Sequence, residues 1–376
     1  MNIIHVLPAL TKGGGERVAA ELSNYAVQDG HEVTIIAAYP VDSALLRDSL
    51  NYDVDVRYVS DSVDSKIGRY LRILPWMWRH RFLLADQDII HCHLTYGTIF
   101  ATFVKVFRRG SRPIVVETYH AVGMPIPRLM RWFHARLAVH RDAFVLMAQD
   151  AFWDKFLARH PDLLSRIIPN GISISGTTRI DTAESISYRN DLGIPDNCKY
   201  VIGSVGRLSP DRKPWLFLPI FTEIANVLGP DVHFVIAGGG TELDPMRSLV
   251  KEHGLAGRVH LPGLILDPKP VMLALDLYIT LNVGATPGVA AMEAAMLGVP
   301  VLAIQLLARY RPSPSDWIWS SANPLDLANR SIHILRSPPD RMSLIESQRS
   351  YVRDNHTAEV MANSYSQLYR DALSIG

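Results

Sequence analysis

The segment NIIHVLPALTKGGGERVAAEL, residues 2–22, contains the pattern on which the fold prediction rests. Its first nine residues are mostly apolar, as in a strand that is buried on both faces. The glycine loop Thr11–Gly15 follows, and from Glu16 to Gln28 the apolar residues recur with helical spacing. A buried strand, a glycine loop and a helix in this order are typical of a parallel α/β sheet.

The same alternation of apolar segments and helical segments continues along the chain. Further strands are expected in the first half at HEVTIIAAY, VDVRYVS, DIIHCHL, PIVVETYHA, AFVLMAQ and RIIPNGI, which begin at residues 31, 54, 88, 113, 143 and 166. The pattern restarts with KYVIGSVGRL, HFVIAGGG, RVHLPG, LDLYITLN and VPVLAIQ, which begin at residues 199, 233, 258, 275 and 299. The prediction is two doubly wound, Rossmann-like α/β domains, with ligands bound beyond the carboxyl ends of the strands in the cleft between them.

A polar stretch near residues 171–199 marks the domain boundary. We expect an N-terminal domain at residues 1–171 and a C-terminal domain at residues 172–355. The last segment, residues 356–376, is a predicted helix that belongs to the second domain or crosses back to the first.

Composition restricts the class of protein. The 376 residues are 48% hydrophobic and 20% charged with a formal net charge of +1, so overall charge does not point to nucleic acid. Two cysteines far apart, Cys92 and Cys198, make a disulfide framework improbable and favour the cytoplasm. The first residues lack the features of a signal peptide, and no apolar run is long enough for a membrane span.

Three loops have the residue types of an anion or sugar site. The glycine loop lets the backbone approach a ligand, although Arg17 and Val18 break the dinucleotide pattern GxGxxG, and a simple tight turn is the alternative. Arg207 and Lys213 stand six residues apart in GRLSPDRKPW, a spacing with which two cations can clamp a diphosphate. Glu293 is the single acid of the apolar segment GATPGVAAMEAAMLGVPV, residues 284–301, and a buried carboxylate there needs hydrogen-bond donors.

Taken together, these fragments resemble a GT-B fold glycosyltransferase of the retaining family 4 type. The resemblance covers nearly the whole chain and is carried, in the family's order, by GGGERV, DIIHCH, IIPNGI, VGRL with RKPW, HFVIAGGG, RVHLPG and MEAAMLGVPVLA. It implies that a nucleotide-activated sugar binds mostly to the C-terminal domain, with no metal and no further cofactor.

The resemblance assigns roles to single residues. Arg207 and Lys213 match the pair that contacts the diphosphate, Glu293 matches the acid that binds the ribose hydroxyls, and His120 matches the histidine that faces the donor sugar. His120, Arg207 and Lys213 are therefore the expected catalytic residues. The other expected donor-binding residues are Gly14, Gly15, Gly239, Thr286, Pro287, Gly288 and Val289.

The chain departs from the family's pattern at one acid. The family usually has two glutamates separated by seven residues, and counting back from Glu293 places Ala285 at the position of the first, within ATPG instead of EGFG. This acid normally touches the hydroxyls of the donor sugar. Its loss leaves the donor sugar open, and with it the level of activity. The segment DQD at residues 86–88 leads directly into a strand and is not interpreted as a metal site.

Residues 66–141 contain thirteen Lys and Arg but only three acids, interleaved with aromatic residues. Cations beside Trp and Phe suit an anionic membrane surface, and an ordinary amphipathic helix packed on the first sheet is the alternative. The expected acceptor or membrane residues are Arg69, Arg72, Trp76, Trp78, Arg131 and Trp132.

The function predicted from these features is retaining transfer of a sugar from a nucleoside-diphosphate sugar, with UDP favoured over GDP. The expected acceptor is a lipid-linked glycan of bacterial surface polysaccharide synthesis, at the cytoplasmic face of the membrane. A nucleic-acid partner is not expected. Two alternatives stay open: a non-catalytic nucleotide-sugar-binding partner of another transferase, and a GT-B nucleotide-sugar epimerase.

Overall fold

The structure is a computed structural model, and it describes residues 1–11, 13–40, 47, 49–62, 67–108, 110–122, 127–173, 182–282, 288–305 and 318–375. The described residues form two compact units. Unit 1 comprises Met1–Ser173 and His356–Gly376, and unit 2 comprises Ile174–Asn355.

Unit 1 contains a seven-stranded parallel sheet. Its strand order is β3-β2-β1-β4-β5-β6-β7. The strands are β1 (Asn2–Leu7), β2 (Glu32–Ala37), β3 (Asp55–Tyr58), β4 (Ile89–His93), β5 (Ile114–Tyr119), β6 (Ala143–Leu146) and β7 (Leu164–Ile167). The order reverses at β1, which pairs with β2 on one side and with β4 on the other. A ligand site is expected at such a reversal, beyond the carboxyl ends of β1 and β4.

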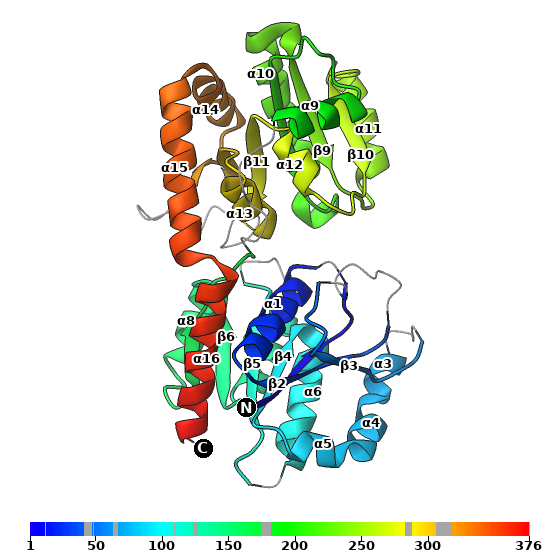
Figure 1. Ribbon diagram of the computed structural model, residues 1–376, viewed down its shortest axis with the longest axis vertical. Coiled ribbons are helices and arrows are strands. Elements are labelled where there is room, and N and C mark those ends of the chain that lie inside the picture. Colours follow the sequence, from blue (N-terminus) through cyan, green and yellow to red (C-terminus); the bar gives the residue numbers. More distant parts are fainter. Residues whose placement is uncertain are drawn as a thin grey trace. The chain divides into compact units, whose positions relative to one another are not determined.

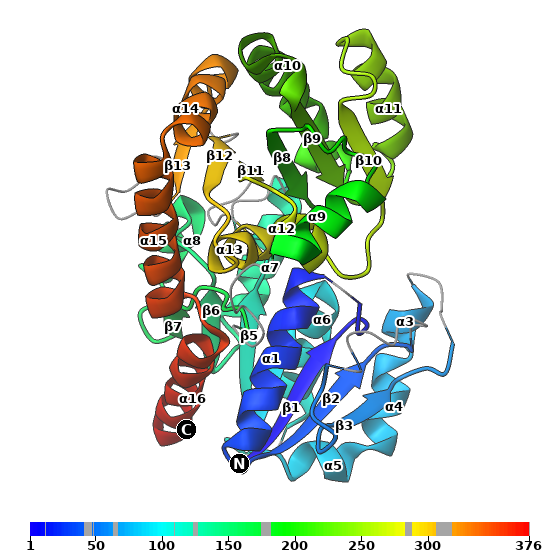
Figure 2. The same cartoon turned by 45° about the horizontal axis from the view of Figure 1, so that its top comes forward.

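Helices cover both faces of this sheet. One face packs against α1 (Gly14–Gln28) and α16 (Ala358–Ile375), which lie side by side in Figures 1 and 2. The other face packs against α4 (Ile73–Arg79) and α6 (Leu94–Phe107). The remaining helices of the unit are α3 (Gly68–Leu71), α5 (Arg81–Ala85), α7 (Arg128–Ala138) and α8 (Ala151–Leu157). Burial on both faces explains why the central strands are mostly apolar, whereas the edge strands β3 and β7 are partly exposed and more polar.

The last helix belongs to unit 1. Its buried residues recur every three or four positions, which places them on one stripe: Ala358, Met361, Ala362, Tyr365, Leu368, Tyr369 and Ala372. This stripe joins the core that α1 forms with the sheet. The helix is therefore part of the first unit's core although it ends the chain.

Unit 2 contains a six-stranded parallel sheet in the order β10-β9-β8-β11-β12-β13. Its strands are β8 (Tyr200–Val205), β9 (Val232–Ala237), β10 (Val259–Gly263), β11 (Leu277–Asn282), β12 (Val301–Gln305) and β13 (Trp319–Ser321). Its helices are α9 (Thr182–Asp191), α10 (Phe217–Leu228), α11 (Leu243–Glu252), α12 (Lys269–Leu273), α13 (Val289–Met296), α14 (Pro324–Arg336) and α15 (Pro338–Asn355), with the short 3-10 turns η1 (Pro210–Arg212), η2 (Pro214–Leu216) and η3 (Gly229–Asp231).

The predicted fold class is confirmed, because each of the twelve apolar segments contains a strand of a parallel sheet. The thirteenth strand, β13, has only three residues and gives too short a pattern to be recognised. In the described part of the chain, no helix is both long enough and apolar enough to cross a membrane.

Candidate active site

The glycine loop and His120 come together at the carboxyl ends of the strands in unit 1. Helix α1 begins at Gly14, within the glycine loop and two residues earlier than expected, and His120 follows the last residue of β5. A Cβ on Gly15 would lie 3.4 Å from Nδ1 of His120 and 3.2 Å from Cδ2 of Leu94. An added Cβ would be in van der Waals contact with the His120 ring and slightly too close to Leu94, so the loop lies directly against the ring.

The amino end of α1 is occupied by a carboxylate of the chain itself. Glu16 accepts a hydrogen bond from Thr11 Oγ1 at 3.0 Å, and burial raises the pKa of its carboxyl group. A Cβ on Gly13 would come within 2.2 Å of Glu16 Oε2, so the Glu16 carboxylate lies directly over Gly13 and would have to shift if a side chain were added there. The expected anion site at this helix end is thus next to an acid, which sequence reasoning missed.

A line of histidines leads from His120 into the sheet. Nε2 of His120 lies 3.1 Å from Nδ1 of His93, the last residue of β4, and Nε2 of His93 lies 3.1 Å from Nδ1 of His5 in β1. Burial lowers the pKa of His120 to about 4 and that of His5 to about 3, and it also lowers the pKa of His93 well below its usual value. All three rings are therefore neutral near pH 7.

His91 is a neighbour of this line but has other partners. Its Nδ1 lies 2.7 Å from the hydroxyl of Tyr369, and its Nε2 lies 2.8 Å from Oγ1 of Thr118. Burial raises the pKa of Tyr369 far above its usual value, so the hydroxyl keeps its proton and can donate it to His91. These contacts tie α16 to the sheet.

Nitrogen atoms of His5, His91 and His93 lie within 4.8 Å of one another, which raises the question of a metal ion. Both ring nitrogens of His91 and both of His93 are already in hydrogen bonds with protein groups. The cluster therefore does not present three free nitrogens to a cation, and its geometry fits a hydrogen-bonded network instead.

In unit 2, the loops that follow β8 and β9 are held against each other by backbone hydrogen bonds. Leu208 N donates to Gly239 O at 2.9 Å, and Gly206 N donates to Ala237 O at 2.9 Å. The contact is so close that a Cβ on Gly238 would lie 1.8 Å from Gly206 O. Arg207 and Gly239, two of the expected donor-binding residues, are thereby brought together.

The two residues that are expected to bind the diphosphate, Arg207 and Lys213, are exposed in these loops. The Arg207 side chain is 62% exposed, and its one described ion pair is a 3.5 Å contact with Asp211. Lys213 is also exposed and has a left-handed backbone, with φ 51° and ψ 53°, between η1 and η2. Such a conformation is uncommon for a residue other than glycine and often marks a functional loop.

Glu293 lies on α13 and is linked to the Arg207 loop through Tyr278 of β11. Burial is the main reason why the pKa of Tyr278 is raised to about 12. Hydrogen bonds with Val205 and Ser204 lower this pKa, and the negative charge of Glu293 raises it. The Tyr278 hydroxyl donates to Val205 O at 2.9 Å, one residue before Gly206. Glu293 is half-buried, and α13 begins after Gly288, whose φ of 86° favours glycine. Val289 is half-buried at the first helical position, whereas Ala285, Thr286 and Pro287 lie outside the described residues.

The basic, aromatic segment splits into a buried side and an exposed side. Trp76 is 8% exposed, and its Nε1 donates to Tyr58 O at 3.1 Å, so the expectation that it contacts a membrane is wrong: it belongs to the core. Trp78 is 74% exposed and Trp132 is 59% exposed. Arg72 is exposed and Arg131 is partly exposed, and Arg69 lies over the ring of Tyr70.

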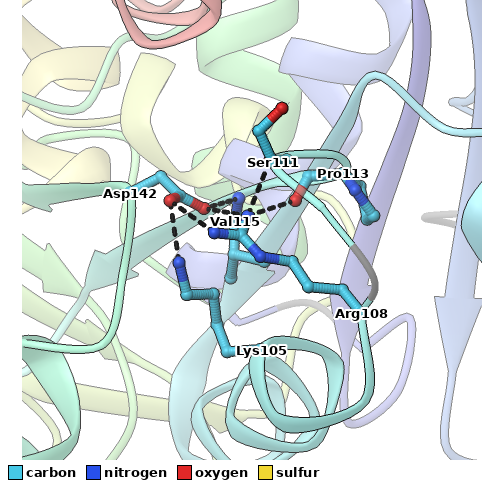
Figure 3. Close-up of polar contacts among 6 residues, drawn as sticks. All are labelled: Lys105, Arg108, Ser111, Pro113, Val115 and Asp142. Carbon is cyan, nitrogen blue, oxygen red and sulfur yellow. Dashed lines mark hydrogen bonds and ion pairs between the residues drawn. The ribbon is translucent and has the colours of Figure 1, made fainter. Parts of the chain in front are cut away.

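The amino ends of the strands in unit 1 carry a different kind of cluster (Figure 3). Asp142, directly before β6, accepts hydrogen bonds from Lys105 Nζ at 2.8 Å, from Arg108 Nη1 at 2.8 Å and from Val115 N at 2.8 Å. Arg108 also donates to the carbonyl oxygens of Ser111 and Pro113. This cluster is at the strand ends opposite His120, and every described partner is a group of the chain, so it joins α6 to the sheet.

Sequence reasoning missed His5, His91 and His93 as site residues. The available signal was the pair of histidines two residues apart in DIIHCH, which face the same side of a strand. His5 completes the group because β1 and β4 are neighbours, with His5 opposite His91.

Both halves of the chain match models of glycosyltransferase families. The model of Glycosyltransferase Family 4 matches residues 12–175, and the model of glycosyl transferases group 1 matches residues 186–351. The O-antigen biosynthesis glycosyltransferase WclY of Escherichia coli is 23% identical over 295 residues, which are 76% of this chain and 79% of WclY. The 2-deoxystreptamine N-acetyl-D-glucosaminyltransferase of Streptomyces fradiae is 31% identical over 232 residues, which are 57% of this chain and 54% of that protein.

Solved structures show the same fold. Anabaena HepE, crystallised with UDP and glucose, has a TM-score of 0.79 and 17% identity, with 99% of this chain and 100% of HepE covered. WaaG, a glycosyltransferase involved in lipopolysaccharide biosynthesis, has a TM-score of 0.64 and 16% identity, with 99% of each chain covered. Together with the two sheets and the two matching models, these likenesses establish that the chain belongs to glycosyltransferase family 4 and has the GT-B fold.

Proposed function

We propose that the protein transfers a hexose, with retention at the anomeric carbon, from a nucleoside-diphosphate sugar to a glycan. The observation that carries the proposal is the joined pair of loops in unit 2, which places the exposed Arg207 cation beside the backbone at Gly239. UDP is the first choice of nucleotide and GDP the second. The UDP complexes of the structurally similar HepE support this order.

In this proposal each residue has a chemical task. Arg207 and Lys213 bind the diphosphate and stabilise its charge as the bond to the sugar breaks. Glu293 accepts hydrogen bonds from the ribose hydroxyls, and His120 faces the donor sugar. The bond from the acceptor oxygen to the anomeric carbon forms on the same face from which the nucleotide departs. The acceptor proton passes to an oxygen of the departing phosphate, so no protein base is needed.

The remaining donor contacts come from backbone and small side chains. They are Gly14, Gly15, Gly239, Thr286, Pro287, Gly288 and Val289. No metal ion or further cofactor takes part in the proposed reaction.

The proposed acceptor is a lipid-linked glycan in bacterial surface polysaccharide synthesis, and the proposed location is the cytoplasmic face of the membrane. The similarity to WclY, an O-antigen biosynthesis enzyme, supports the acceptor class. An exposed apolar face supports the location. It consists of Ile67, Leu71, Leu74, Trp78 and Phe82, each at least 42% exposed. Arg81 lies over the rings of Trp78 and Phe82, and Arg69 and Arg72 are cations of the same segment. Arg131 and Trp132 of α7 are further proposed acceptor or membrane residues.

Thermal unfolding with UDP, GDP, ADP and NAD tests the donor proposal. A ligand at about 100 times its dissociation constant stabilises by about 2.7 kcal/mol, enough to raise the melting temperature measurably. We expect a shift with UDP that is lost in Arg207→Ala and kept in Arg247→Ala, an exposed arginine of the same unit whose partner is Asp244.

Transfer from the matching sugar nucleotide is the second measurement. A shift with UDP but no transfer to any glycan and no hydrolysis would support the alternative of a non-catalytic binding partner, which the replacement of the family's acid by Ala285 favours. No shift with any diphosphate would refute the proposed donor site.

A further inference from the structure

His5, His93 and His120 form one line of hydrogen bonds that starts inside the sheet of unit 1 and ends beside Gly15. The two contacts are 3.1 Å each. The outer nitrogens of the line, His5 Nε2 and His120 Nδ1, are buried and have no hydrogen-bond partner in the described structure. A residue at the donor-facing end is thus connected to a side chain in the middle of the core.

The line permits only two arrangements of protons. A neutral imidazole has one N–H, so His93 donates through one nitrogen and accepts through the other. If His93 donates from Nδ1 to His120, then His120 holds its proton on Nδ1 and His5 donates from its own Nδ1. If the direction is reversed, His120 has a bare Nδ1 and His5 has its N–H on Nε2.

The position of His5 decides between them. The His5 side chain is 0% exposed, and the reversed arrangement would leave its Nε2–H buried without an acceptor. Buried N–H groups without a partner are rarer in proteins than unpaired acceptors. The first arrangement leaves a lone pair at His5 and places the unpartnered N–H on Nδ1 of His120 instead. His120 is half-buried beside the glycine loop, where a bound ligand can accept this hydrogen bond, whereas His5 is 0% exposed.

We infer that His5 and His93 are positioning residues, which hold the His120 ring in place and select the tautomer with the proton on Nδ1. His120 then presents a hydrogen-bond donor beside the glycine loop. This inference rests on the proposed function in one respect, namely that His120 faces the donor sugar. The N–H would donate to a hydroxyl or ring oxygen of that sugar, whereas the other tautomer could only accept.

Long-range 1H–15N NMR on protein with 15N-labelled histidine tests the tautomer without any substrate. Protonated and bare ring nitrogens have well separated 15N shifts, and the His120 signals are identified by their loss in His120→Gln. We expect Nδ1 of His120 to be protonated in the wild type and to lose this preference in His93→Phe. The same substitution at His91, which lies on the same strand with equal burial but outside the line, is expected to leave the His120 signals unchanged.

Activity supplies the second readout. We expect His93→Phe to lower kcat about fivefold to tenfold, the size expected for one hydrogen bond, with a smaller change in the KM for the donor. His93→Asn, whose amide can take the place of Nδ1, is expected to recover part of this loss. If His93→Phe does not fold, His5→Leu makes the same test from the other end of the line.

The outcomes separate this inference from the proposed function. A proton on Nε2 of His120 in the wild type, or an unchanged tautomer in both His93→Phe and His5→Leu, would overturn it. A wild type that neither binds a nucleoside diphosphate nor transfers sugar would refute the proposed function, while the tautomer measurement would still decide whether His5 and His93 act on His120.

Discussion

Gly238 lies against Gly206 so closely that a Cβ on Gly238 would stand 1.8 Å from the Gly206 carbonyl oxygen. The φ of Gly238, 156°, adds a conformation that other residues rarely adopt. We expect Gly238→Ala to push the two loops of unit 2 apart and to weaken UDP binding at least tenfold, which corresponds to about 1.4 kcal/mol. Isothermal titration calorimetry measures this change.

Gly254→Ala is the matched control for that substitution. Gly254 lies in the same unit with φ 69°, but nothing lies within 4 Å of an added Cβ. It should cost about 1 kcal/mol of folding stability through its backbone conformation and leave UDP affinity unchanged. Equal affinities in Gly238→Ala and wild type would contradict the role given to the loop contact.

Glu293→Gln tests the proposed ribose contact. A neutral amide is a weaker acceptor than a carboxylate for hydroxyl donors, and we expect the dissociation constant for UDP to rise about tenfold. Removing the ribose hydroxyl that Glu293 binds should cost less affinity in the variant than in wild type, because the variant has already weakened that hydrogen bond. A full double-mutant cycle with 2′-deoxy and 3′-deoxy UDP measures the coupling, and zero coupling with both would remove Glu293 from the ribose site.

The buried histidines predict a loss of stability at mildly acidic pH. The unfolded chain binds a proton on His5 near pH 6.5, whereas the folded chain does so only near pH 3 because burial lowers the pKa. The contribution of His5 to the free energy of unfolding is therefore fully present above about pH 6.5. It falls by about 1.4 kcal/mol per pH unit as the pH drops toward 3.

Urea unfolding at pH 7 and pH 5 measures this dependence. His5→Leu should reduce the loss between the two values by about 2 kcal/mol, and His140→Gln, at an exposed site of the same unit, should leave it unchanged. The same loss in His5→Leu as in wild type would show that His5 does not titrate in this way.

The parallel sheets could be predicted because strands that are buried on both faces give nearly continuous apolar segments. The unit to which α16 belongs could not be predicted, because an apolar stripe shows that a helix is buried but does not show which element it packs against. Its place depends on contacts between residues far apart in sequence, such as Tyr369 with His91, 278 residues apart.

The dependence on contacts between distant residues also limited the prediction of the candidate site. His5 and His93 are 88 residues apart and meet only because β1 and β4 are neighbours in the sheet. Trp76 and Trp78 look equivalent in the sequence, yet they point to opposite sides of a short helix, one into the core and one outward. Local pattern gives the residue types of such a site, and the packing of the helix decides which of them are accessible.

The ion cluster around Asp142 predicts a stability effect without a functional one. Lys105 and Arg108 are only 18% and 15% exposed, so Asp142→Asn leaves two largely buried cations without their carboxylate. We expect a loss of about 2 kcal/mol in the free energy of unfolding and no change in UDP affinity. The exposed pair of Arg57 and Asp55 is the control, since Asp55→Asn should cost less than 1 kcal/mol. Equal losses at both sites would contradict the structural role of the Asp142 cluster.

The exposed apolar face of unit 1 predicts binding to anionic vesicles. Trp78 and Leu71 are 74% and 71% exposed, and burial of such a side chain in lipid contributes about 1.5–3 kcal/mol. Leu71→Ser with Trp78→Ser should lower the partition coefficient at least a hundredfold in flotation with vesicles that contain phosphatidylglycerol. Trp319→Ser, at a partly exposed tryptophan of unit 2, is the control and should leave binding unchanged. Added salt should weaken the wild type because the arginines of this face contribute through charge. Binding that is equal for wild type and the double variant would mean that this face does not contact the membrane, and the lipid-linked acceptor would then lose its structural support.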